Sequence, residues 1–201
     1  MARSEPTVAQ QFMWARDLSL GGLCIALGVV VPIIFHAVGG GQLGPVFLPM
    51  YAPVLACALL TSPQVAFLVG LLTPMLSSAL TGMPPVLPTL PLMVAELSLM
   101  SLVASLLRRR LRLHAFLALL AALLTGRAVM GGAVWGLVHL LPEPLLAGLP
   151  PIMLHPLTYV GAATVKALPG LVLNLAVVPA VVLAVERRSL AIGHDHRHPS
   201  S

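Results

Sequence analysis

The chain has 201 residues, of which 58% are hydrophobic and only 8% charged, and its mean hydropathy is +0.99. A soluble domain carries about a quarter charged residues, so this composition excludes a soluble globule and predicts an all-helical integral membrane protein, nearly all of it in one domain. The net charge of +5 and the pI near 10.3 raise the question of nucleic-acid binding, which the placement of the basic residues answers.

Six apolar segments follow one another along the chain and predict six transmembrane helices. Their expected ranges are 18–36, 47–60, 64–80, 89–107, 113–141 and 156–186. The second is short, with Pro49 and Pro53 near its start, and Pro74 is expected to kink the third. We expect residues 1–17 to form a cytoplasmic N-terminal segment, 18–188 the membrane domain, and 189–201 a disordered polar tail.

The basic residues are unevenly distributed between the two sides of this six-span layout. Nine of the eleven lie on one side: Arg3, Arg16, Arg108, Arg109, Arg110, Arg112, Arg187, Arg188 and Arg197. The opposite loops, at about 37–46, 81–88 and 142–155, contain no Lys or Arg. The positive-inside rule therefore predicts that both termini are cytoplasmic. This bias accounts for the high pI without a nucleic-acid surface, and the arginines at 108–112 also suit contact with anionic lipid or an acidic partner.

The three opposite loops are rich in Pro and Gly yet apolar, whereas solvated loops usually carry Ser, Asn or Asp. Two interpretations stay open: the loops cap a cavity, or they fold back into the bundle without any ligand. The segment 43–53 carries no charge, and Tyr51 is its main side-chain hydrogen-bonding group. We expect this segment to form part of the roof of a pocket.

Three ionisable residues lie inside the predicted spans: Glu96, Arg127 and Lys166. Each costs roughly 2.5–3.5 kcal/mol in hydrocarbon, so each is expected to face the bundle interior, a partner or water. At ~1.5 Å per residue they lie ~10, ~18 and ~15 Å from the outer ends of their helices, which allows their long side chains to meet. Their sum is +1. One pairing would leave a cation for an anionic ligand group; the alternative is a buried salt bridge plus one snorkelling cation.

Neighbouring side chains are candidates for the same pocket. They are Tyr51, Thr89, Trp135, Tyr159 and Asn174. Trp135 and Tyr159 suit stacking on a flat ring, although packing or anchoring at the interface is the commoner role of a single aromatic residue. Asn174 is suited to bonding either a ligand or another helix.

Catalytic and metal motifs are weak in this chain. His36, His139 and His155 lie near the outer helix ends, but their separation gives no metal-site spacing, and no metal or other cofactor is expected. There is no GxxxxGK[ST], GxSxG or HExxH sequence. Two further hypotheses remain: an intramembrane metal-dependent enzyme that uses Glu96 with His139 or His155, and a structural or assembly protein whose charges only pair helices.

Three segments carry a resemblance to a known family. They are LGGLCIALGVVVPIIFH from residue 20, LGPVFLPMYAPVLACALLTSPQVAFLVGLLTPMLSSALTGMPP from residue 43, and PLMVAELSLMSLVASLLRRRLR from residue 91. Together they resemble the substrate-binding S component of energy-coupling factor (ECF) vitamin transporters. The likeness covers most of residues 18–112, and the later helices agree in layout more than in motif.

The resemblance implies a six-helix protein of a prokaryotic cell membrane that is not an enzyme. It implies capture of a vitamin from outside, near the outer loops and the last three helices, and work with a coupling transmembrane subunit and two ATPases. The family docks through small residues of its first helix, and Gly22 and Ala26 match those positions. The positive balance suggests a carboxylate, such as a pantothenate- or niacin-like compound. A ring-bearing or uncharged vitamin, cobalamin, or neutralisation by Glu143 remain open alternatives.

Overall fold

The computed structural model describes residues 7–39, 43–140, 142 and 149–195, which are almost entirely helical and include no strand. The elements are α1 (Val8–Gly39), α2 (Leu43–Phe47), α3 (Tyr51–Leu60), α4 (Pro63–Thr81), α5 (Thr89–Arg110), α6 (Ala115–Leu140), the 3₁₀ helix η2 (Pro151–Leu154) and α8 (Pro156–Asp195). The helices α1, α4, α5, α6 and α8 are long and apolar enough to cross a membrane. The side chains of residues 9, 43 and 189–195 are not described.

The predicted all-helical membrane fold is confirmed, and the second of its six segments is divided. The shorter apolar segment Gly44–Leu60 is divided into α2 and α3. Leu48 has a left-handed φ of 48°, and Pro49 follows it. A residue before proline is disfavoured in the right-handed helical region, so a helix that enters at Leu43 cannot continue smoothly into α3.

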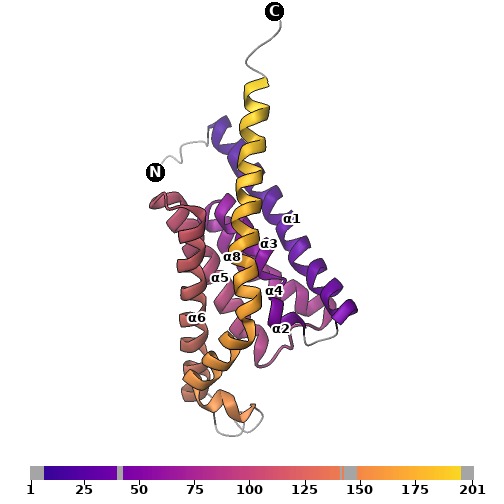
Figure 1. Ribbon diagram of the computed structural model, residues 1–201, viewed down its shortest axis with the longest axis vertical. Coiled ribbons are helices and arrows are strands. Elements are labelled where there is room, and N and C mark those ends of the chain that lie inside the picture. Colours follow the sequence, from indigo (N-terminus) through magenta and orange to yellow (C-terminus); the bar gives the residue numbers. More distant parts are fainter. Residues whose placement is uncertain (1–6, 40–42, 141, 143–148, 196–201) are drawn as a thin grey trace, which may run out of the picture.

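Two helices are longer than the sequence predicted. α1 begins at Val8 and includes the polar residues up to 17, which were expected to precede the first span. α8 continues to Asp195, into the segment from 189 that was expected to be a disordered tail. α1 begins and α8 ends at the same end of the bundle (Figure 1). This agrees with an even number of crossings, while the side of the membrane stays a prediction.

The core of the bundle is built around α3, which contacts α1, α4, α5 and α8. Val54, Leu55 and Cys57 of this helix have no exposed surface. Since lipid tails are as apolar as leucine, helices in a membrane associate through close packing rather than through the hydrophobic effect. Gly70 provides such packing, because a Cβ built on it would lie 2.5 Å from the Leu97 carbonyl oxygen of α5.

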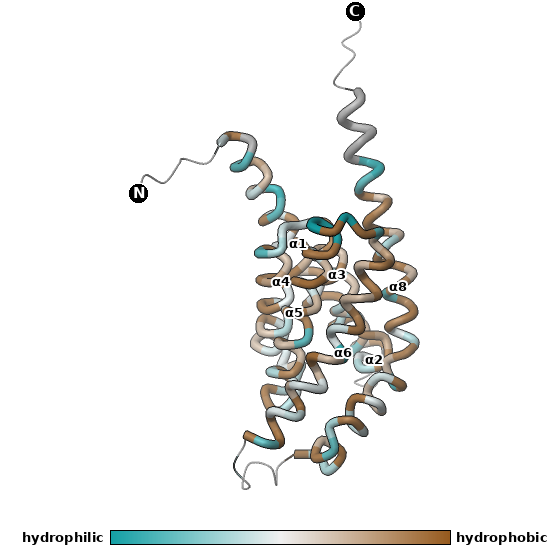
Figure 2. Tube along the Cα trace, turned by 90° about the vertical axis from the view of Figure 1, so that its left-hand side faces the viewer, coloured by the Kyte–Doolittle hydropathy of each residue, from teal (hydrophilic) through white to brown (hydrophobic). Residues whose placement is uncertain are grey.

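One end of the bundle, which we call the arginine end, holds the α5–α6 turn with Arg108–Arg112, the α3–α4 turn, Asp17 and Glu186. Hydrophilic residues gather there in Figure 2. Asp17 accepts a hydrogen bond from the Ser62 backbone N–H at 2.7 Å, at the start of α4. Arg109 lies 3.5 Å from the same carboxylate oxygen and donates to the Leu60 carbonyl at 2.9 Å. These contacts tie α1 and α5 to the α3–α4 turn.

Candidate functional site

A cavity of about 960 Å³ lies toward the opposite end of the bundle from the arginine end. Residues from α1, α4, α5, α6 and α8, from the α2–α3 segment, from the 82–88 loop and from η2 line it. The polar side chains among them are His36, Tyr51, Ser77, Thr81, Thr89, Glu96, Arg127, Tyr159 and Lys166. Such a volume lies within the range of small-molecule sites.

Most of the cavity wall is apolar and consists of methionines and prolines. These residues are Met50, Met83, Met93, Met130, Pro32, Pro45, Pro49, Pro84 and Pro85. Methionine side chains adapt to irregular shapes, while proline fixes the backbone that carries it. Hydroxyl groups hold part of this wall, because Ser77 and Ser78 donate to the Met83 and Pro84 carbonyls, each at 2.8 Å. The apolar 82–88 loop therefore forms one side of the cavity.

Glu96 of α5 and Arg127 of α6 form an ion pair in which Arg127 Nη2 lies 2.5 Å from Glu96 Oε1. The Glu96 side chain is 1% exposed and that of Arg127 is 14% exposed. Gly126 makes room for the carboxylate, since a Cβ there would lie 3.3 Å from Glu96 Oε1 and 3.0 Å from the sulfur of Met100. The absent side chain at residue 126 thus allows α6 to approach the charged group.

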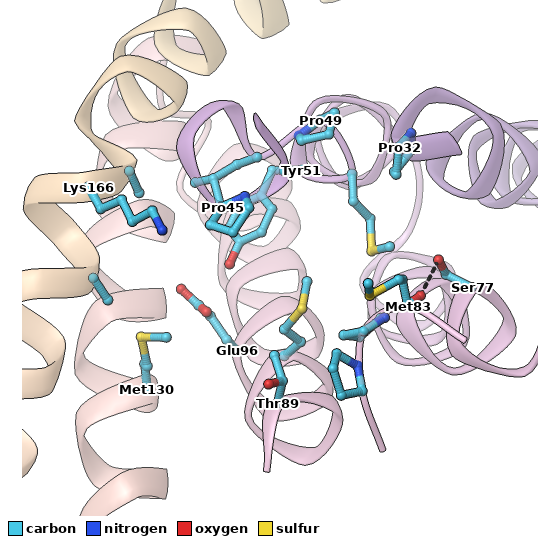
Figure 3. A pocket seen from close by; sticks show the side chains of 18 of the residues that line it. Pro32, Pro45, Pro49, Tyr51, Ser77, Met83, Thr89, Glu96, Met130 and Lys166 are labelled. Carbon is cyan, nitrogen blue, oxygen red and sulfur yellow. Dashed lines mark hydrogen bonds between the residues drawn. The ribbon is translucent and has the colours of Figure 1, made fainter. Parts of the chain in front are cut away.

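The Tyr51 hydroxyl lies beside this ion pair and accepts a 3.4 Å hydrogen bond from Arg127 Nη2. In Figure 3 the hydroxyl points toward the Glu96 carboxylate. Glu96 Oε2 and Arg127 Nε are both buried, and neither has a hydrogen-bond partner in the described part of the chain. The two opposite charges cancel, and the pair still has one hydrogen-bond acceptor and one donor without a partner among the described residues.

Lys166 extends from α8 toward the space between Pro45, Tyr51 and Glu96 (Figure 3). It forms no ion pair or hydrogen bond with any residue in the described ranges. Glu143, an acidic alternative from the sequence, lies outside those ranges. Glu96 forms its ion pair with Arg127. The charge of Lys166 is therefore left without an acidic partner among the described side chains.

Two of the remaining candidates, Tyr159 and Thr89, also line the cavity, whereas Trp135 and Asn174 are not among its lining residues. Helical spacing explains the division. Tyr159 and Lys166 are seven residues apart, which is about 20° from a common face. Trp135 follows Arg127 by eight residues, as Asn174 follows Lys166, and eight residues rotate the side chain by about 80°.

The two side chains outside the lining have other contacts. Trp135 is 57% exposed and stacks on His139 with ring centroids 4.4 Å apart. Asn174 is 2% exposed and donates to the Gly170 carbonyl at 2.7 Å. Sequence reasoning also missed Ser77 and Thr81 of the lining. Their i, i+4 spacing at the end of α4, next to an apolar loop, is the signal that could have revealed them.

The three histidines do not converge. The Nδ1 atoms of His36 and His139 bond the carbonyls of Pro32 and Trp135, at 2.7 and 2.8 Å. Among the described residues no three His, Cys, Asp or Glu side chains form a group that could hold a metal ion. Histidine therefore contributes to this site through His36 in the cavity wall.

Gly22 and Ala26 lie on the exposed face of α1, away from the cavity. A Cβ built on Gly22 would meet no atom within 4 Å. This small-residue step is consequently not used for packing within the described chain.

A family model described as "ECF transporter, substrate-specific component" matches residues 16–182. The chain belongs to this family of ECF substrate-specific components. No curated protein and no solved structure matches it. The family resemblance in the sequence is thereby confirmed. S components are subunits of transporters rather than enzymes, and they work with an ECF module of a coupling subunit and ATPases. The protein is accordingly a multi-pass, substrate-specific transporter subunit.

Proposed function

We propose that this S component captures a vitamin or related micronutrient that carries a carboxylate, for an ATP-driven importer of a prokaryotic cell membrane. It delivers the substrate with a coupling transmembrane subunit and two ATPases. Both termini face the cytoplasm, as the positive-inside rule requires, and the cavity opens toward the outside. Glu96, Arg127, Lys166, Tyr51 and Tyr159 form the polar part of the binding site.

The observation that carries this proposal is the charge of Lys166, which has no ion-pair partner among the described residues and lies in a largely apolar cavity. A carboxylate beside the ammonium group would neutralise it, and hydrogen bonds to charged groups contribute about 1.5–3 kcal/mol. The methionine and proline walls suit an apolar body, and Glu96 Oε2 could accept a hydrogen bond from an N–H or O–H group elsewhere on the substrate. The substrate would thus be an amphiphilic small molecule with one anionic end.

Gly22 and Ala26 support the proposed contact with the coupling subunit. Small residues four apart allow a second helix to approach closely, and both lie exposed on α1. We assign this step to the contact with the coupling subunit. Leucine at either position should reduce co-purification of the coupling subunit and ATPases and should leave ligand affinity unchanged.

The test is a binding screen of B vitamins on the purified protein, followed by comparison of each bound carboxylate with its carboxamide. The wild type should favour the carboxylate by about tenfold or more, from the charge-assisted bond to Lys166. Lys166→Gln should abolish that preference, while Lys166→Arg, the matched control, should retain most of it. Binding of no vitamin, or equal losses for carboxylate and carboxamide in Lys166→Gln, would overturn the proposal.

A further inference from the structure

A second cavity, of about 560 Å³, lies between the first turns of α4 and the last turns of α5, at the other end of these two helices from the residues that line the large cavity. Phe67 and Leu68 of α4 and Leu102 and Leu106 of α5 form its walls, and Arg110 lies at its end. Leu68 is 47% exposed, so the groove opens on the surface that faces lipid. From Leu102 to Arg110 the groove follows α5 for about 12 Å.

The arginines of this helix end are not equivalent. Arg108 pairs with Glu186 at 2.8 Å, and Arg109 pairs with Asp17. Arg110 is exposed and forms no ion pair or hydrogen bond with residues in the described ranges. Arg110 follows Leu106 by four residues, which places its guanidinium group over the same groove.

This combination matches the chemistry of one class of ligand. An apolar channel on a lipid-facing surface accepts an acyl chain, and an arginine at the interface end of the channel accepts an anionic phosphate. The groove also begins at the N-terminal turn of α4, where Pro63 stands at the first position. A soluble anion would make no use of the four apolar walls, and a neutral lipid would make no use of Arg110.

We propose that the groove between α4 and α5 binds one anionic phospholipid, with its headgroup phosphate on Arg110 and an acyl chain along Leu102 and Leu106. The site lies at the arginine end, where positive-inside orientation would meet the anionic leaflet. It is independent of what the large cavity binds. An anionic lipid held here would bridge α4 and α5 across the surface of the bundle.

Native mass spectrometry of the full chain in detergent tests this directly. Phosphatidylglycerol and phosphatidylcholine with identical acyl chains are titrated onto the wild type and three variants. The wild type should bind the first phosphatidylglycerol more tightly than phosphatidylcholine. Arg110→Gln should weaken phosphatidylglycerol about fivefold, the loss expected for one basic residue near an anionic headgroup, and should leave phosphatidylcholine unchanged.

Two further variants separate a defined site from general attraction. Arg112→Gln removes an exposed charge from the same turn that does not line the groove, and it should leave the first binding step unchanged. Leu106→Trp fills the apolar wall and should weaken both lipids. Equal losses in Arg110→Gln and Arg112→Gln would overturn the proposal, as would unchanged lipid binding in Leu106→Trp. Unchanged lipid binding in Arg110→Gln with loss of the coupling subunit would also overturn it and would make the groove a protein contact.

Discussion

The Glu96–Arg127 pair makes a sharp prediction about stability. Arg127→Met removes the cation while the carboxylate stays 1% exposed. Breaking a buried pair from one side costs about 3–5 kcal/mol, because an uncompensated charge is left behind. Glu96→Gln should cost less, about 1–3 kcal/mol. Arg127 retains the Tyr51 hydroxyl and partial access to the cavity in that variant.

The double variant, with both substitutions together, distinguishes this reasoning from simple loss of packing. Replacing both partners by uncharged groups of similar volume is often close to neutral. The double variant should therefore be more stable than Arg127→Met alone, so the coupling free energy between the two positions should exceed the cost of Glu96→Gln, about 1–3 kcal/mol. Unfolding of the four proteins in one mild detergent measures this cycle. A double variant as unstable as Arg127→Met would refute the argument, because the buried carboxylate would not then be the source of the loss.

Two further predictions concern the frame of the bundle. Gly70→Ala should destabilise the protein by about 1–3 kcal/mol in thermal unfolding, because its Cβ would lie 2.5 Å from the Leu97 carbonyl oxygen. Gly22→Ala is the control. A Cβ at residue 22 would meet no atom within 4 Å, so this variant should not be destabilised. Asp17→Ala should cost about 0.5–2 kcal/mol by removing the acceptor of the Ser62 N–H at the start of α4. Asp17→Asn keeps an acceptor there and should recover most of that loss; equal losses for Ala and Asn would assign the effect to charge alone.

The sequence predicted the membrane class, the six segments and the three intramembrane charges because each depends on a quantity that the chain itself contains. Segment length and apolar content determine whether a helix spans a bilayer. A charge among apolar residues is expected to face the interior, a partner or water. None of these features depends on how one helix is rotated against the next.

The pairing of the charges did depend on that rotation, and the sequence left it open. Both Arg127 and Lys166 were within reach of Glu96. The structure selects Arg127, since Gly126 lets α6 lie against the carboxylate. A sequence shows a glycine beside an arginine but not which neighbouring helix the glycine faces.

Helix ends were predicted less well for a related reason. Hydropathy marks where a helix enters the apolar layer, but polar residues at the ends of α1 and α8 continue the helix beyond that layer. The division between α2 and α3 likewise depends on the left-handed backbone at Leu48. Leucine rarely adopts this conformation, so its identity gave no signal.

The contact between α8 and the end of α2 has a mechanical consequence for the cavity. A Cβ on Gly170 would lie 2.5 Å from the carbonyl carbon of Phe47, so the two backbones touch directly, with no side chain between them. Lys166 lies one helical turn before Gly170, while Phe47 leads into the roof at Leu48 and Pro49. Because no side chain separates the two backbones, the segment with Leu48 and Pro49 cannot move toward α8 without displacing α8, the helix that carries Lys166. The position of Leu48 and Pro49 in the cavity wall and the position of the Lys166 charge are therefore expected to change together.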